Sequence, residues 1–280
     1  MLDRAEKVNA KSIVYTFLNH PTSIFAPERL PNLLMTAEER KSALLKIGVN
    51  EVAMREFTTE LAGESPSQFA EYLRATYPEL DTVFCGPNWT FGAGGKGNAD
   101  FLREHGFNVV TVPFEIDGDE PISSTRIRNV LKKGDIAEAN RLLGHTYSVS
   151  GNVISGKGLG RNIGFPTLNI TFAEENHPVL PFGVYEVSTH YGRGIANWGL
   201  APTMGEQAWK SPVLEIHILK ANNGESPHLA LENATRIKTD FLRFIREERK
   251  FSSLEELKKQ ISADISSVSP NHHPTGTVPG

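Results

Sequence analysis

Residues 156–170, GKGLGRNIGFPTLNI, combine closely spaced glycines and two cations with a threonine and an asparagine two residues apart. Gly156, Gly158 and Gly160 lie within six residues, Gly164 follows them, and the cations are Lys157 and Arg161. Because a glycine has no Cβ, backbone N–H groups beside it can turn toward an anion, and the cations add positive charge. This loop therefore predicts an anion-binding site.

Thr167 and Asn169 follow the loop, two residues apart on a segment that we expect to be extended. Side chains two apart on an extended chain point to the same face. A hydroxyl and an amide oxygen are suitable ligands for a hard cation such as Mg²⁺. The loop and these ligands together predict a nucleotide phosphate site, although the pattern GxxxxGK[ST] is not matched. The alternative is a glycine-rich hairpin with a surface arginine.

A second polar cluster, ISSTRIR, occupies residues 122–128. Its hydroxyl residues are Ser123, Ser124 and Thr125, and its cations are Arg126 and Arg128. The cluster stands where a helix is expected to begin, and the free backbone N–H groups of a helix N-terminus favour an anion. The alternative is an ordinary N-cap followed by a solvated basic face.

The first half of the chain alternates short apolar runs with helical patterns. Strands are predicted at 12–17, 52–57, 82–86 and 109–114, and helices at 36–47 and 67–77. Thr36 with Glu39 forms a capping-box signature at the start of the first helix. Strands alternating with helices predict an open α/β sheet with parallel strands. Such a sheet binds ligands at the carboxyl ends of its strands, here residues 19–21, 86–97 and 121–128.

After Gly144 the chain becomes rich in short β patterns punctuated by Gly, Pro and Asn. The predicted strands are 147–154, 183–190, 194–198, 214–219 and 235–244. They indicate an antiparallel sandwich or small barrel. A closing helix is predicted over 252–266, capped by Ser252 and Glu255. We therefore predict one domain at 1–144, a second at 145–267 and a disordered tail at 268–280.

The 280 residues carry a net charge of −4 and a single cysteine, Cys85. The acidic balance argues against binding to nucleic acid or to a membrane surface, and one cysteine excludes an internal disulfide. No apolar run approaches the roughly 20 residues of a membrane span, and the N-terminus lacks a secretory signal pattern. These features predict a cytoplasmic protein, and they are compatible with an oligomer.

The order of motifs resembles the bacterial bifunctional riboflavin kinase/FAD synthetases from residue 1 to about 267. In the second half the matching pieces are GKGLGRNIGFPTLNI, Gly183-Val184-Tyr185, the Ala196–Gly199 turn followed by Pro202-Thr203, LEIHI at 214–218 and FLRFIREERKFSSLEELKKQI at 241–261. In the first half they are YTFLNHP at 15–21, LMTAEERKSALLKIGV at 34–49, CGPNWTFGAGGKGN at 85–98 and ISSTRIRNVLKKGDI at 122–136. The resemblance implies an open, doubly wound, nucleotidyltransferase-like α/β domain. An antiparallel Greek-key β-barrel with a closing helix would follow it.

In the second domain the resemblance implies an ATP-dependent riboflavin kinase that makes FMN. The loop Gly156–Arg161 would wrap the ATP phosphates, and Thr167 and Asn169 would help to hold Mg²⁺ and phosphate. Glu215 of LEIHI would be the general base on the riboflavin 5′-hydroxyl, since a primary alcohol is a poor nucleophile until its proton is taken. From the residues alone, Glu215 also fits an outward strand residue opposite a basic neighbour.

In the first domain the resemblance implies an FMN adenylyltransferase, with ATP phosphates at ISSTRIR and Arg128 as the motif arginine. His20 and the loop Asn88–Gly97 would line the crevice that receives FMN and ATP. The family's domain opens with a G-x-F-D-G-x-H-x-G-H turn that occurs nowhere in this chain. We therefore expect a truncated start, little or no FAD formation and a less stable first domain.

A flavin- or nucleotide-binding protein without turnover is the alternative function. The combination of Thr167, Asn169 and Glu215 favours the enzyme, because a pure binder needs neither metal ligands nor a base. Two departures from the family pattern bear on substrate affinity: Ala201 replaces a basic residue usual before Pro-Thr, and residues 221–233 replace a shorter turn.

Overall fold

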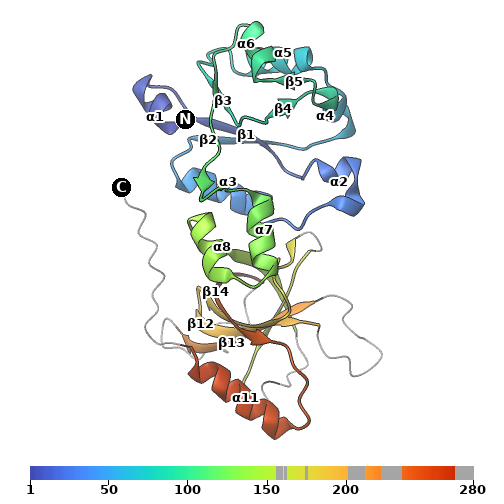
Figure 1. Ribbon diagram of the computed structural model, residues 1–280, viewed down its shortest axis with the longest axis vertical. Helices are drawn as coiled ribbons and strands as arrows, with labels where there is room; N and C mark the ends of the chain where they lie inside the picture. Colours follow the sequence, from blue (N-terminus) through green and yellow to red (C-terminus); the bar gives the residue numbers. More distant parts are fainter. Residues whose placement is uncertain (156–159, 161–162, 174–175, 201–211, 222–234, 269–280) are drawn as a thin grey trace. The chain divides into compact units, whose positions relative to one another are not determined.

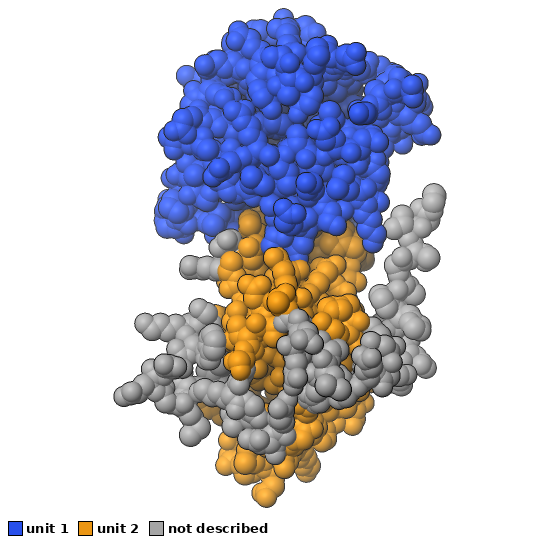
Figure 2. Space-filling model, turned by 180° about the vertical axis from the view of Figure 1, so that it is seen from behind, with its two compact units in different colours: residues 1–31, 36–122 blue, residues 32–35, 123–280 orange. Residues whose placement is uncertain are grey.

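The computed structural model describes residues 1–155, 160, 163–173, 176–200, 212–221 and 235–268. The chain divides into two compact units, which are coloured separately in Figure 2. Unit 1 comprises residues 1–31 and 36–122, and unit 2 comprises 32–35 and 123–280. None of the helices among the described residues is both long and apolar enough to span a membrane.

Unit 1 contains the four predicted parallel strands, each shorter than the sequence pattern indicated. β1 (Ile13–Phe17) pairs in parallel with β2 (Glu51–Arg55), and β3 (Val83–Cys85) pairs in parallel with β6 (Val109–Thr111). Within unit 1, where every residue is described, no ladder joins the two pairs. The α/β class predicted for this half is confirmed. Two small hairpins, β4–β5 (Thr90–Phe91, Gly97–Asn98) and β7–β8 (Ile116–Asp117, Glu120–Pro121), complete its strands.

The α-helices of unit 1 are α1 (Leu2–Lys7), α2 (Thr22–Phe25), α3 (Ala37–Lys46), α4 (Thr59–Gly63), α5 (Pro66–Thr76) and α6 (Ala99–Glu104), with 3₁₀ turns at Pro27–Arg29 and Ala93–Gly95. Four of the six α-helices of unit 1, namely α3 to α6, begin at a Thr, Ser or Asn whose side chain caps the helix. The capping box of Thr36 and Glu39 at α3 is confirmed, and Ser65 with Gln68 forms a second one at α5. The core lies between α5, α6 and the β3–β6 pair, and Cys85 is a buried member of it.

Unit 2 is built on a closed six-stranded antiparallel barrel. Its strands are β9 (Ser148–Ile154), β10 (Leu168–Thr171), β11 (Gly183–Thr189), β12 (Gly192–Gly199), β13 (Val213–Ala221) and β14 (Arg236–Glu247). The order around the barrel is β10-β13-β12-β11-β14-β9, and β9 closes it on β10. Because β14 returns to lie beside β11 of the β11–β12–β13 meander, the arrangement is a Greek key. The predicted antiparallel barrel is confirmed.

Outside the barrel, the described part of unit 2 contains the helices α7 (Ser124–Lys132), α8 (Ile136–Leu143) and α11 (Leu254–Ser266) (Figure 1). Asn140 of α8 donates to the carbonyl of Phe241 and accepts from the backbone N–H of Tyr147, which ties the helix to the barrel. Gly144 ends α8 in the left-handed region at φ 70°, where glycine is favoured. Helices α7 and α8 therefore belong to the same compact unit as the barrel. The domain boundary predicted near residue 144 stays a prediction.

The closing helix α11 is present, and its cap lies one residue later than the sequence suggested. Ser253, and not Ser252, is the N-cap, because its hydroxyl accepts from the backbone N–H of Glu256. Ser252 instead donates from both its backbone N–H and its hydroxyl to the Glu256 carboxylate. The predicted Ser252/Glu255 pair is thus wrong by one position, and the carboxylate of Glu256 accepts from the residue before the N-cap rather than from the N-cap itself.

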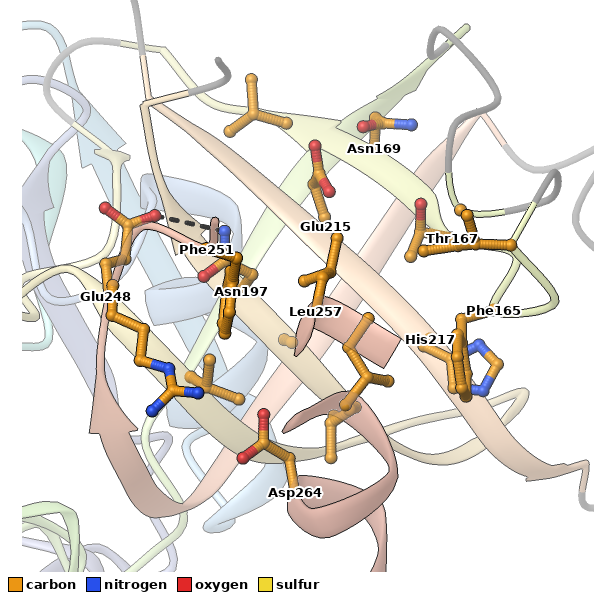
Figure 3. A pocket seen from close by; sticks show the side chains of 18 of the residues that line it. Phe165, Thr167, Asn169, Asn197, Glu215, His217, Glu248, Phe251, Leu257 and Asp264 are labelled. Atoms are coloured by element: carbon orange, nitrogen blue, oxygen red, sulfur yellow. Dashed lines mark hydrogen bonds between the residues drawn. The ribbon is translucent and has the colours of Figure 1, made fainter. Parts of the chain in front are cut away.

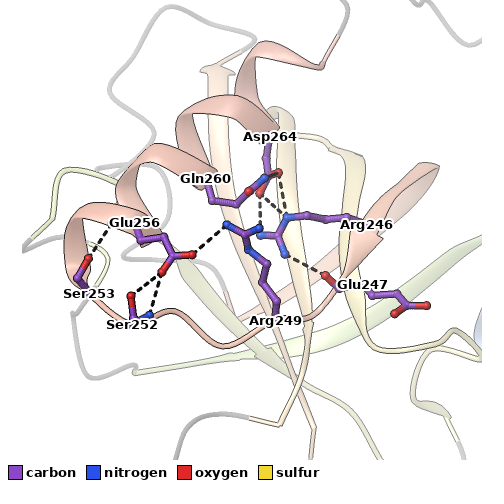
Figure 4. A network of polar contacts seen from close by, with 8 residues as sticks. All are labelled: Arg246, Glu247, Arg249, Ser252, Ser253, Glu256, Gln260 and Asp264. Carbon is purple, nitrogen blue, oxygen red and sulfur yellow. Dashed lines mark hydrogen bonds and ion pairs between the residues drawn. The ribbon is translucent and has the colours of Figure 1, made fainter.

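A buried ion pair holds α11 against the barrel (Figure 4). Arg246 at the end of β14 donates to both carboxylate oxygens of Asp264, over distances of 2.8 to 3.1 Å. Gln260 donates to the same carboxylate at 2.7 Å, and the side chain of Asp264 is only 4% exposed. A buried carboxylate needs this degree of pairing, because an unpaired charge in the interior is costly.

Candidate active site

Three polar side chains form a row across neighbouring strands of the barrel. Asn169 of β10 lies directly opposite Glu215 of β13, and Glu215 lies directly opposite Asn197 of β12. Directly opposed residues have Cβ atoms about 5 Å apart, so the three side chains lie within reach of one another. In Figure 3 the Glu215 carboxylate stands between Asn169 on one side and Asn197 on the other.

The strand pattern explains why this row faces outward. Leu214, Ile216 and Ile218 of β13 are buried in the barrel, so the alternating residues Glu215 and His217 project from the other face. These two residues line a cavity on the outer face, beside α11.

The cavity has a volume of about 1100 Å³. A pocket for a single small ligand has roughly 300–1,000 Å³, so this cavity is at the upper end of that range or above it. Its polar and charged lining side chains include Thr167, Asn169, Asn197, Glu215, Arg246, Glu248 and Asp264. Its apolar lining side chains include Phe165, Val184, Ile195, Leu200, Phe251, Leu257 and Ile261. The cavity therefore offers both polar and apolar surface to whatever occupies it.

Glu215 is the carboxylate at the centre of this row of polar side chains. Burial raises the pKa of Glu215 above its ordinary value, and the negative charge of Glu248 raises this pKa further. Both effects disfavour the ionised form, so the carboxylate takes a proton more readily than an exposed glutamate does. A carboxylate of this kind, fixed on a barrel strand, has the properties of a general base.

Asn197 and Glu248 are pocket residues to which the sequence analysis assigned no role. The amide of Asn197 donates to Glu248 Oε1 at 3.2 Å (Figure 3). Asn197 could have been noticed as a lone polar side chain between the buried residues Ala196 and Trp198 of β12. Glu248 follows β14 in a run of charged residues, where the sequence offers no signal that distinguishes it from its neighbours.

The predicted phosphate loop is described only in part. Gly156, Lys157, Gly158 and Arg161 lie outside the described residues, whereas Gly160 is described. The backbone N–H groups of Ile163 and Phe165 donate to the carbonyl of Gly160, at 3.2 and 2.8 Å. A Cβ on Gly160 would overlap the carbonyl oxygen of Phe165 and stand 3.3 Å from Thr167 Oγ1. The absence of a side chain at Gly160 therefore lets this residue lie close to Thr167.

A magnesium ion at this end of the cavity would need oxygen atoms from the nucleotide as well as from the protein. Among the described residues, no three His, Cys, Asp or Glu side chains are grouped as a metal site. Thr167 and Asn169 supply two neutral oxygens, which is a donor set suited to a hard cation that also binds substrate phosphates. The predicted pair of ligands fits the metal on the chemistry of its donors.

The residues predicted for the adenylyltransferase site are divided between the two units. In unit 2, Ser123 caps α7 by accepting from the backbone N–H of Arg126, and Ser124 and Thr125 are exposed in the first turn. The guanidinium of Arg128 donates to the carbonyl of Asn32 at 2.7 Å. In unit 1, His20 accepts from the backbone N–H of Thr22 at 3.2 Å, and Asn88 is exposed in a turn. The roles of these residues stay predictions.

Comparison with known proteins assigns a family to each half of the chain. The riboflavin kinase family matches residues 143–270, and the FAD synthetase family matches residues 1–126. The bifunctional riboflavin kinase/FMN adenylyltransferase of Escherichia coli K12 is 32% identical over 94% of this chain and 83% of its own length. The enzyme of the same description from Bacillus subtilis strain 168 is 30% identical over 93% of this chain and 82% of its own length.

A solved structure shares the architecture of both halves. The crystal structure of a macrolide-efflux protein from Streptococcus pneumoniae superposes with a TM-score of 0.78 at 28% sequence identity. The match covers 95% of this chain and 85% of that one. The relatives, the two family matches and the fold agree, and the chain belongs to the family of bifunctional riboflavin kinase/FMN adenylyltransferases.

Proposed function

We propose that the cavity of unit 2 is where riboflavin is phosphorylated by ATP, with Glu215 as the general base. The observation that carries the proposal is the row of Asn169, Glu215 and Asn197 across three adjacent strands, facing a cavity lined by both polar and apolar side chains. The family supplies the two substrates, ATP and riboflavin. The row supplies a base beside neutral oxygen ligands.

Different lining side chains of the cavity suit different parts of these substrates. The apolar side chains of Phe251, Leu257 and Ile261 suit the flat ring system of a flavin, because burying apolar surface is favourable. The polar row suits the ribityl chain, which ends in the 5′-hydroxyl. Gly160, Thr167 and Asn169 lie at the end where the triphosphate would bind, and they carry no negative charge to repel it.

The proposed reaction transfers one phosphoryl group. Glu215 accepts the proton of the 5′-hydroxyl as that oxygen bonds to the γ-phosphorus, and the bond from the γ-phosphorus to the bridging oxygen of ADP breaks. The products are FMN and ADP, and the protonated Glu215 then releases the proton to solvent. Mg²⁺, held by Thr167 and Asn169, would offset the negative charge of the ATP phosphates.

A chromatographic assay tests this proposal directly. Purified chain is incubated with riboflavin, ATP and Mg²⁺, and FMN, FAD and ADP are quantified separately. We expect one ADP for every FMN formed. Riboflavin binding without any FMN would contradict the proposal and favour a binding protein without turnover.

A further inference from the structure

We propose that His217 is a positioning residue for the phosphate end of the kinase site, acting on Thr167 through the carbonyl of Pro166. This inference rests on the proposed kinase function and adds a residue to it. His217 lies on β13 two residues after Glu215 and lines the same cavity. Its Nδ1 lies 2.8 Å from the carbonyl oxygen of Pro166, which precedes it by 51 residues.

The chemistry of this contact fixes the state of the imidazole. A carbonyl oxygen only accepts, so the hydrogen must be on Nδ1 of His217. The neutral ring with its hydrogen on Nδ1 makes this bond, and so does the protonated ring, which donates from both nitrogens. The ring of Phe165 packs edge-on against the imidazole, with centroids 5.7 Å apart and an interplanar angle of 81°. This packing holds the plane of the imidazole.

The bond to Pro166 constrains Thr167 because the two residues share a peptide plane. The carbonyl of Pro166 and the N–H of Thr167 belong to one rigid unit, so holding the oxygen holds the plane. The proline ring fixes its own φ and restricts Phe165 to extended conformations. On the other side of Thr167 the β10 ladder begins, with Leu168 opposite Ile216. The backbone of Thr167 is therefore constrained from both directions, and His217 supplies the side-chain part of that constraint.

A fixed backbone at Thr167 gives its hydroxyl a defined direction. Threonine is branched at Cβ, so few side-chain rotamers remain once the backbone is set. The hydroxyl lies near Gly160. A Cβ added to Gly160 would stand only 3.3 Å from Oγ1 of Thr167. His217 therefore helps to place Thr167 relative to Gly160 and to Asn169. Because these residues serve the triphosphate, loss of the His217 contact should weaken the binding of Mg·ATP and leave flavin binding largely unchanged.

Two substitutions separate the hydrogen bond from the bulk of the side chain. His217→Leu removes the donor, whereas His217→Asn keeps an N–H donor close to the position of Nδ1. We expect His217→Leu to raise the KM for Mg·ATP roughly 3- to 10-fold, which is the effect of losing one neutral hydrogen bond. We expect the KM for riboflavin and kcat to change little, and His217→Asn to restore the KM for Mg·ATP. His190→Leu, at an exposed turn away from the cavity, is the matched control.

Two readouts that need no turnover complete the test. In calorimetric titrations, Mg·ADP should bind the wild type and His217→Asn with similar affinity and His217→Leu more weakly. In the wild type, ¹⁵N spectroscopy of the His217 ring should find hydrogen on Nδ1. An unchanged KM for Mg·ATP in a folded His217→Leu protein, or an equal rise in the Leu and Asn variants, would overturn the proposal. A neutral ring with its hydrogen on Nε2 would overturn it even if the Leu variant did not fold. If the wild type makes no FMN, the kinase proposal fails. The calorimetry and the spectrum still test whether His217 positions the nucleotide-binding residues.

Discussion

Asn169 and Glu215 face each other directly across β10 and β13, although 46 positions separate them in the sequence (215 − 169). The pairing places a neutral oxygen donor beside the carboxylate whose pKa is raised by burial. In the proposed reaction the two side chains act on the two reacting groups, Asn169 on the phosphates and Glu215 on the hydroxyl. Their register on the barrel therefore defines the point at which phosphate and alcohol must meet.

Replacement of Glu215 by Gln should nearly abolish FMN formation and leave riboflavin binding largely intact. The amide keeps the shape of the side chain and cannot accept the proton, so we expect kcat to fall roughly 10²- to 10⁴-fold. The measurements are FMN formation by chromatography and riboflavin binding by flavin fluorescence. Glu247→Gln, at the exposed end of β14, is the matched control. Near-normal turnover of Glu215→Gln would remove the general-base assignment.

Replacement of Thr167 by Val should raise the Mg²⁺ concentration needed for half-maximal activity. Valine keeps the branched shape and removes the oxygen that we assign to the metal and phosphate. The expected rise is roughly 10- to 100-fold, as for a lost bond to a charged group. Titration of activity with Mg²⁺ at fixed ATP measures it, and Thr167→Ser should restore most of the wild-type dependence. An unchanged Mg²⁺ requirement in the Val variant would contradict the assignment.

A methyl group at Gly160 should impair the use of Mg·ATP. The added Cβ would overlap the carbonyl oxygen of Phe165, so the turn before Thr167 must shift. We expect a KM for Mg·ATP at least roughly 10-fold higher, because small displacements of positioning groups carry large costs. Steady-state kinetics of Gly160→Ala, compared with Gly63→Ala, where a Cβ meets open space, checks this expectation. Equal kinetics in the two variants would show that the loop tolerates the shift.

Removal of the Asp264 carboxylate should loosen α11. Asp264→Ala leaves the guanidinium of Arg246 without its buried partner, and such a loss costs about 3 kcal/mol. Native-state hydrogen exchange of the α11 amides measures the loss locally. Asp240→Asn is the control, because it breaks the exposed ion pair with Lys238, which is worth less than about 1 kcal/mol. If both variants protect α11 equally, the Arg246–Asp264 pair does not anchor the helix.

The 280-residue chain should make FMN and little or no FAD. The G-x-F-D-G-x-H-x-G-H turn that the family resemblance assigns to ATP binding in the first domain does not occur in this sequence. Groups that neutralise triphosphate charge in the transition state are a large part of such catalysis. The assay supplies FMN and ATP and follows FAD by chromatography, with riboflavin phosphorylation in the same preparation as the positive control. FAD formation at a rate typical of an enzyme would refute this prediction.

Local signals in the sequence determined much of the fold and part of the site. The box of Thr36 and Glu39 was predictable because a helix cap depends on residues three positions apart. The alternation of Leu214, Glu215, Ile216 and His217 predicted a strand with one buried face for the same kind of reason. The order of the motifs indicated the family, because each motif is a continuous segment that can be found in the sequence without the structure.

The tertiary structure decided which side chains share the cavity. Glu215 lies between Asn169 and Asn197 because strands distant in sequence pair at one register, and a shift of one residue would turn each side chain to the other face. Glu248 reaches Asn197, and His217 reaches Pro166, by the same long-range closure of the barrel. Sequence periodicity fixes which residues share a face of one strand. The pairing of strands depends on the packing of the whole barrel, and only the folded chain brings these residues together.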